Sequence, residues 1–221
     1  MSVLNILYTA DRIELLSDTL QYAKGEPVGL TVQKVHTADR FAWCTRGRCW
    51  IGDTFDPVAA RCVDLDEAEI AAASWIDSIA EDDLIGHSGI EVTVAGFSGR
   101  SGGLAVMQFS REHAKPVEAK VFEPGVYLLP SREGIPALPA TVTMQQFYRL
   151  ALAQHAAEKI GTGRGMDGMC IGGVMHLTTV TSAGADQRIV GLYPDYDQHA
   201  KAFGDPNAEE VAAFLAQQAA A

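Results

Sequence analysis

The feature that most constrains this fold is the order of its hydrophobic patterns, in which pairs of short strand-like runs alternate with single helical segments. Near the start, such runs predict two hairpins, Leu4 to Tyr8 with Arg12 to Ser17, and Leu30 to His36 with Arg40 to Thr45. Strands joined by short polar connections pair antiparallel. The chain therefore does not build the parallel sheet of a doubly wound fold.

Three segments carry the period and the capping residues of helices. Two of them begin with a capping box, in which a side chain before the helix and an acid or amide three residues later accept hydrogen bonds from free backbone N–H groups. The pairs are Asp64 with Glu67 and Thr143 with Gln146. In the last helix, Val211, Phe214 and Leu215 are expected to be buried. The expected helices run from Asp64 to about Glu81, from Thr143 to a stop at Gly161, and from Asp205 with Pro206 in its first turn.

Further strands are expected between and after the first two helices. Four runs separated by Gly- and Pro-containing turns predict a meander, and two more runs predict a hairpin. No linker or repeat interrupts residues 1–221, so we expect a single domain. The predicted fold is α+β, a four-layer αββα sandwich of two antiparallel sheets flanked by helices. The runs are Ile90 to Phe97, Leu104 to Ser110, Val117 to Phe122, Val126 to Leu129, Gly172 to Thr181 and Gln187 to Tyr193.

Composition excludes several classes of function. The 221 residues include 17 basic and 28 acidic side chains, a net charge of −11, which disfavours nucleic acid and membrane surfaces as partners. No apolar run approaches the roughly 20 residues that span a bilayer, and no export signal stands at the start. We therefore expect a cytoplasmic protein.

No metal or cofactor is expected. The four cysteines have no CxxC spacing and are expected to be reduced, and the six histidines have no metal-ligand spacing. Asp186, Asp195 and Asp197 lack the glycine turn and closing glutamate of a calcium loop, so they are interpreted as solvent-exposed loop charges. Cys44 and Cys49 are expected to be buried or half-buried.

The N-terminus offers a nucleophile and a base in one residue. Met1 precedes the small residue Ser2, so removal of the initiator methionine is expected, which would leave Ser2 with a hydroxyl and a free α-amino group. Such an amine has a pKa near 7.7–8.0, and a terminal amine that activates a hydroxyl is an established arrangement for nucleophilic catalysis.

Two charged residues lie at informative spacings from Ser2. Asp18, in the segment LLSDT, is 16 positions later, and Lys34, in QKVH, is 32 positions later. Asp167 and Cys170 stand before an isoleucine and two glycines near the other end. With these spacings the chain resembles proteasome β-type subunits and their bacterial relatives, which are N-terminal-nucleophile hydrolases.

The resemblance implies a role for each residue. Lys34 would place positive charge beside the Ser2 hydroxyl, and Asp18 would pair with Lys34. Gly47 would supply the oxyanion N–H, although it lies one residue before the position that the spacing gives, Arg48. Asp167 and Cys170 would lie beside the α-amino group. The chain has serine where the family has threonine, cysteine at 170 where it has serine, and one expected helix where it has two.

The resulting hypothesis is a cytoplasmic hydrolase that cleaves peptide or amide bonds through an acyl-ester on Ser2, without a cofactor. The resemblance implies a homo-oligomer, a ring or a stack, that shelters the site. The alternative is a catalytically inactive structural or assembly protein of the same fold. Retention of Ser2, Asp18 and Lys34 favours the enzyme, whereas serine for threonine and the cysteine at 170 favour the alternative.

Overall fold

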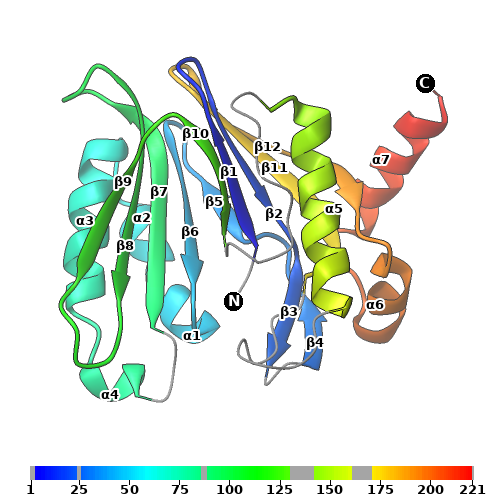
Figure 1. Ribbon diagram of the computed structural model, residues 1–221, viewed down its shortest axis with the longest axis horizontal. Helices are drawn as coiled ribbons and strands as arrows, with labels where there is room; N and C mark the ends of the chain where they lie inside the picture. Colours follow the sequence, from blue (N-terminus) through cyan, green and yellow to red (C-terminus); the bar gives the residue numbers. More distant parts are fainter. Residues whose placement is uncertain (1–2, 24–25, 86–88, 130–141, 161–170, 221) are drawn as a thin grey trace.

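The computed structural model describes residues 3–23, 26–85, 89–129, 142–160 and 171–220. Within them, strands form three antiparallel sheets: the β1 sheet, in the order β10-β1-β2-β11-β12, the β7 sheet, in the order β5-β6-β7-β8-β9, and a small β3–β4 sheet (Figure 1). The strands are β1 (Leu4–Tyr8), β2 (Ile13–Ser17), β3 (Leu20–Ala23), β4 (Glu26–Leu30), β5 (Val35–Thr37), β6 (Phe41–Arg46), β7 (Ile90–Ser98), β8 (Gly103–Arg111), β9 (Glu118–Phe122), β10 (Gly125–Leu129), β11 (Val174–Thr181) and β12 (Gly184–Leu192).

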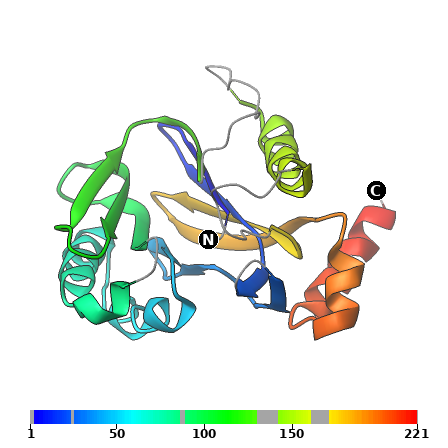
Figure 2. The same ribbon diagram turned by 60° about the horizontal axis from the view of Figure 1, so that its bottom comes forward.

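Two long helices and several shorter ones accompany the sheets. Figure 2 shows α3 with the short helices α1, α2 and α4 on one side of the sheets, and α5, α6 and α7 on the other. The helices are α1 (Cys49–Gly52), α2 (Asp56–Ala59), α3 (Leu65–Asp77), α4 (Glu81–Leu84), α5 (Met144–Ile160), α6 (Tyr196–Phe203) and α7 (Ala208–Ala219).

Three apolar cores hold these elements together. Phe41, Val92 and Val94 face α3 from the β7 sheet. A second core lies between the two large sheets, where Leu15 of β2 and Ala95 of β7 belong to one buried cluster. The third packs the other face of the β1 sheet against α5. Because strand side chains alternate between faces, each large sheet contributes to two cores.

Several local predictions are confirmed. The first expected hairpin is present, with β1 and β2 paired antiparallel and Leu4 opposite Ser17. Asp64 accepts the N–H of Glu67 at 3.0 Å and caps α3. Thr143 and Gln146 exchange hydrogen bonds at the start of α5, as a capping box requires.

The predicted four-strand meander is wrong in its last strand. β7, β8 and β9 pair in sequence, but β10 pairs with β1, with Leu129 opposite Leu4. The chain crosses between sheets after β9, where Phe122 packs edge-on against Tyr127 with ring centroids 4.7 Å apart. An apolar run indicates a strand but does not specify which sheet edge it joins.

The second expected hairpin is also present, since β5 pairs antiparallel with β6 and Val35 lies opposite Cys44. Its first strand is shorter than the predicted Leu30 to His36, so the placement of Lys34 inside a strand is wrong. The Gly- and Pro-containing stretch before it pairs back on Leu20–Ala23 as β4, and Thr31 donates its N–H to Thr19 O at 2.9 Å. Lys34 therefore directly precedes the short strand β5.

The helix predictions need several corrections, and α6 was not predicted at all. The first long helix ends at Asp77 instead of near Glu81, and the four-residue helices were not predicted because one turn is too short to show a period. The last helix begins at Ala208 instead of Asp205. Its Val211 is buried as expected, whereas Leu215 is 49% exposed.

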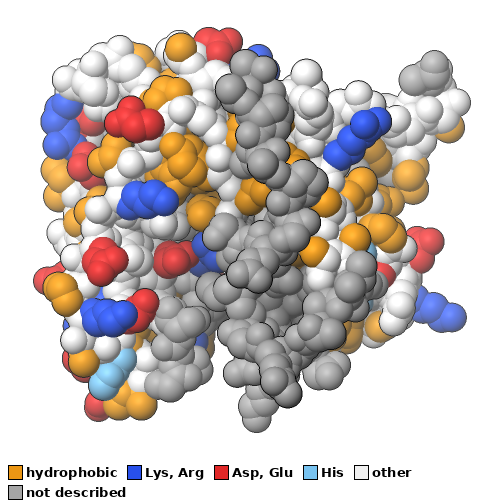
Figure 3. All heavy atoms as spheres, in the orientation of Figure 1, with side chains coloured by type: hydrophobic (Ala, Val, Ile, Leu, Met, Phe, Trp, Pro, Cys, Tyr) orange, Lys and Arg blue, Asp and Glu red, His pale blue; other side chains and the backbone are white. Residues whose placement is uncertain are grey.

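Two observations concern the hydropathy of the helices and the charges on one face. None of the helices that the structure describes has the length and hydropathy to traverse a lipid bilayer. On the face in Figure 3, acidic and basic side chains are interspersed over the β8–β9 side instead of gathering in one patch.

A buried histidine makes the stability of this fold depend on pH. His176 of β11 is 3% exposed, and neither ring nitrogen has a hydrogen-bond partner in the described part of the chain. Burial lowers the pKa of His176 from 6.5 to about 4, which nearby Asp205 opposes only in part. Between these two pH values the unfolded chain binds a proton that the native protein does not.

We therefore expect the free energy of unfolding to fall by roughly 3 kcal/mol as pH drops from 6.5 to 4 on account of His176. His176→Leu should remove this component in urea titrations at several pH values. His113→Leu, at an exposed position, is the control and should keep the full slope. An unchanged slope in His176→Leu would contradict the assignment.

Candidate active site

The centre of the candidate site is the carboxylate of Asp18, which follows the last residue of β2 and is 0% exposed. Its Oδ1 accepts hydrogen bonds from Lys34 Nζ at 2.8 Å and from the Val3 N–H at 3.2 Å. Its Oδ2 accepts the Gly172 N–H at 3.4 Å. Each oxygen of this buried charge thus has a partner, as the cost of removing a charge from water demands.

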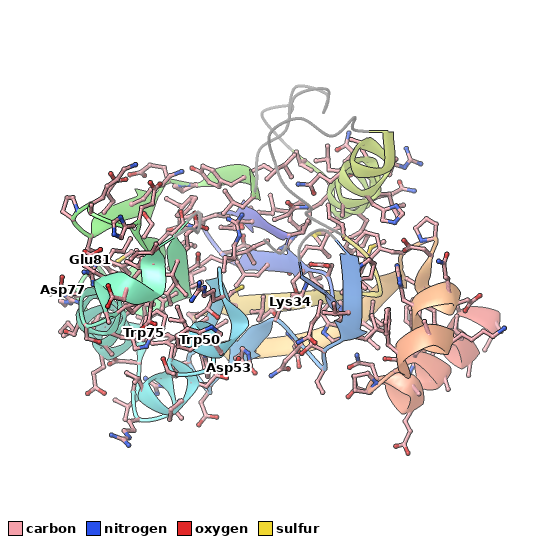
Figure 4. The ribbon with its side chains drawn as sticks, turned by 90° about the horizontal axis from the view of Figure 1, so that it is seen from below. Lys34, Trp50, Asp53, Trp75, Asp77 and Glu81 are labelled. Carbon is pink, nitrogen blue, oxygen red and sulfur yellow. The ribbon has the colours of Figure 1, made fainter. Side chains whose placement is uncertain are left out.

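Lys34 is held by two acceptors. Besides Asp18, its Nζ donates to the carbonyl oxygen of Leu20 at 2.6 Å, and its side chain is 10% exposed. An ammonium group has three N–H donors, and acceptors among the described residues account for two of them. Figure 4 shows Lys34 near the middle of the molecule, between α1, which carries Trp50, and the β3–β4 hairpin.

A second chain segment locks the residues after β2 in place. Thr19 and Leu20 donate their N–H groups to Gly172 O at 3.3 and 3.2 Å, and the Val174 N–H donates to Thr19 Oγ1 at 2.9 Å. Gly173 has φ +80°, and a Cβ there would lie 2.4 Å from Thr19 Oγ1, so only glycine fits. The sequence places Cys170 before these glycines but does not show the contacts that the glycines make with Asp18 and Thr19.

The predicted site residues divide into two groups. The structure brings Asp18 and Lys34 together as an ion pair, as the sequence predicted, beside the backbone of Val3. Ser2, Asp167 and Cys170 lie outside the described residues. The catalytic roles assigned to these five residues stay predictions.

Gly47 has a clear reason to be glycine. It directly follows β6 with φ +132°, and a Cβ would lie 2.9 Å from Gly89 O, so no other residue fits without strain. This backbone requirement explains the glycine without a catalytic role. Its predicted function as an oxyanion donor stays a prediction.

Cys44, on β6, is a chemically different candidate close to Lys34. It is 1% exposed, and burial raises the pKa of its thiol to about 12, although the charges of Arg46 and Lys34 act in the opposite direction. At neutral pH the group is a thiol, and the thiolate is the reactive form. A neutral, buried thiol is a poor nucleophile, and the predicted burial of Cys44 is confirmed.

One group of buried charges contradicts the sequence analysis. Asp195 was expected to be a solvent-exposed loop charge, but its side chain is 9% exposed. Its Oδ1 lies 3.1 Å from His155 Nε2 and its Oδ2 lies 3.2 Å from His199 Nε2. Asp195 is shielded from solvent by the tertiary structure. It lies between β12 and α6, and α5 and α6 each place a histidine beside it. In the described part of the chain, no group of three or more His, Cys, Asp or Glu side chains could hold a metal ion.

No protein-family model matches this chain, and no curated protein matches it in sequence. The chemistry of the site therefore has to be inferred from its geometry. That geometry is a buried carboxylate that positions an ammonium group and the backbone of residue 3, with two of the three ammonium N–H donors bonded to described residues.

The ion pair should contribute strongly to stability. Removing one partner of a buried pair leaves an uncompensated charge and costs about 3–5 kcal/mol. We expect Asp18→Ala to lower the free energy of unfolding by about this amount, whereas the double variant with Lys34→Met should be less destabilised than Asp18→Ala alone. Urea denaturation measures both.

The exposed pair of Glu112 and Lys115 provides the matched control. Their side chains are 52% and 57% exposed, so Lys115→Ala should change the free energy of unfolding by about 1 kcal/mol or less. An equal decrease in the free energy of unfolding for Asp18→Ala and Lys115→Ala would show that the buried pair contributes no more to stability than the exposed pair.

Proposed function

We propose that this protein is a proteasome-like N-terminal-nucleophile hydrolase that cleaves peptide or amide bonds through an acyl-ester on Ser2, after Met1 has been removed. The observation that carries the proposal is that Asp18 Oδ1 accepts from both Lys34 Nζ and the Val3 N–H. The Val3 nitrogen is the atom to which Ser2 is bonded. A single buried oxygen thus ties the residue next to the proposed nucleophile to a fixed positive charge.

The proposed first step is acylation. The α-amino group of Ser2 takes the hydroxyl proton while Oγ attacks the substrate carbonyl carbon, and the amide nitrogen leaves after receiving that proton. The remaining N–H of Lys34 stabilises the negative charge that develops on Oγ. The N–H of Gly47 is proposed to donate to the carbonyl oxygen. Water then attacks the ester carbonyl carbon while the α-amino group takes a proton from that water and gives it to Oγ, so that the C–Oγ bond breaks and the product leaves as an acid.

Asp18 does not exchange protons in this scheme. It accepts a hydrogen bond from Lys34 at 2.8 Å and keeps the ammonium group oriented. The Leu20 carbonyl oxygen restrains the same group from another direction, at 2.6 Å. Charge held in place before the reaction needs no reorganisation as the transition state forms, which is the main source of electrostatic catalysis.

The arrangement of the elements supports the same proposal. The three apolar cores stack α3, the β7 sheet, the β1 sheet and α5 in that order, which is the αββα order of the N-terminal-nucleophile fold. By the same resemblance we propose a homo-oligomer that restricts the site to extended peptide or amide substrates. A catalytically inactive structural or assembly protein of this fold is the competing outcome of the experiments below.

We expect purified protein to have the intact mass of a chain that begins at Ser2 and to gain one adduct from an electrophile selective for N-terminal nucleophiles. Ser2→Ala should gain none and should hydrolyse no peptide, because the attacking hydroxyl is missing. A chain with an added N-terminal residue should remain folded and inactive, since its residue 2 has no free amine. Hydrolysis by the extended chain at the rate of the unextended one would exclude the proposed nucleophile.

Lys34→Ala should lower kcat by about 10²–10³-fold, the scale of losing one stabilising donor in a transition state. Lys115→Ala, which removes an exposed lysine, should leave kcat unchanged. Near-ultraviolet circular dichroism establishes that each variant is folded. A folded protein without adduct formation or turnover would favour the inactive assembly protein.

A further inference from the structure

A second group of ionisable side chains lies on the other side of Gly172 from Asp18. Asp195 bridges two helices there, because His155 belongs to α5 and His199 to α6. The side chains of the three residues are 9%, 5% and 8% exposed. The proposed acylation and hydrolysis use none of them, so this group, which we call the Asp195 cluster, needs a separate explanation.

The Asp195 cluster lies beside Gly172, on the side where any other residue would carry its Cβ. A Cβ placed on Gly172 would lie 3.2 Å from Asp195 Oδ1 and 3.5 Å from His199 Cδ2. From the same residue, the N–H points to Asp18 Oδ2 at 3.4 Å. Gly172 therefore lies between the two carboxylates, donates its N–H to Asp18 and leaves no room for a side chain beside Asp195.

The backbone next to Gly172 is fixed from the same direction. Gly173 O accepts the N–H of Tyr193 at 3.0 Å. The Tyr193 ring packs on His155, with ring centroids 5.3 Å apart. The segment 172–173 is thus held between the end of β2 and the residues that follow β12.

The contacts of Asp18 show why this position matters. Among the described residues, Oδ1 accepts hydrogen bonds from Lys34 and Val3, whereas Oδ2 accepts one from Gly172. A carboxylate held at both oxygens cannot rotate about its Cβ–Cγ bond, but one held at a single oxygen can. Rotation would move Oδ1 and, with it, the Lys34 ammonium group. A displacement near 1 Å at a reacting group can cost about 10²-fold in rate.

We infer that Asp195 is a positioning residue for the proposed hydrolysis, which it serves through Gly172 and Asp18. With His155 and His199 as partners, its carboxylate occupies the space beside Gly172 and limits the movement of the Gly172 N–H away from Asp18 Oδ2. The ammonium group of Lys34 is thereby held in one orientation. This inference rests on the proposed function for its catalytic meaning, but its structural link can be measured separately.

The first test is Asp195→Asn, which keeps the size of the side chain and removes its charge. We expect kcat to fall by about 10-fold or more while KM changes less than about twofold, because alignment is lost and substrate contacts are kept. The control is Asp197→Asn, at an exposed position in the first turn of α6, which should have the kcat of the unchanged protein.

A second readout does not depend on turnover. In protein labelled with ¹⁵N-lysine, the Nζ signal of Lys34, assigned by its loss in Lys34→Arg, should shift or exchange faster with water in Asp195→Asn and remain unchanged in Asp197→Asn. If the unaltered protein has no activity but the signal moves, the proposed function fails and the link stands. If Asp195→Asn keeps both the kcat and the signal, the inference is overturned.

Gly172→Ala provides the test if Asp195→Asn does not fold. Its added methyl group would press on the Asp195 carboxylate and on Leu20 Cδ2, which lies 3.0 Å from the Cβ position. We expect the same loss of kcat and the same change in the Lys34 signal. Where both single variants fold, their double variant should lose little more than the larger single loss, since both act through one contact. Losses that multiply would overturn the inference.

Discussion

The structure depends on the burial of one carboxylate. Asp18 has no exposed surface, and its oxygens are reached by a side chain before β5, by the backbone before β1 and by the backbone before β11. A buried charge without such partners would be too costly to keep. The end of β2, the start of β1 and the approach to β11 are therefore constrained together, and the candidate site lies where these constraints meet.

The pair formed by Asp18 and Lys34 could be predicted from the sequence because the resemblance to N-terminal-nucleophile hydrolases gave spacings from Ser2. The path between them could not. Lys34 was expected within a strand, but the chain instead forms the β3–β4 hairpin and reaches Leu20 O and Asp18 from the residue before β5. Gly- and Pro-containing segments indicate turns, and local patterns do not show that such a segment also pairs as a strand.

The contacts on the other side of Asp18 were missed because they join distant parts of the chain. Gly172 has no side chain whose chemistry could identify it, and its importance comes from its backbone N–H and from the absence of a Cβ. Asp195 was interpreted as a loop charge, since nothing near it in sequence predicts that α5 would cover it with His155. Burial of polar groups is a tertiary property. β10 is a similar case, because its pattern indicated a strand and only packing assigned it to β1.

The central claim is that the buried Asp18 and Lys34 pair serves a nucleophile at residue 2. The most direct measurement is to mix the protein with an activated ester, stop the reaction with acid within the first turnover and locate the acyl group by peptide mass spectrometry. The account predicts a single acyl group on the Oγ of Ser2, formed more slowly in Lys34→Ala. An acyl group on another side chain, or formation at the same rate in Lys34→Ala, would contradict it.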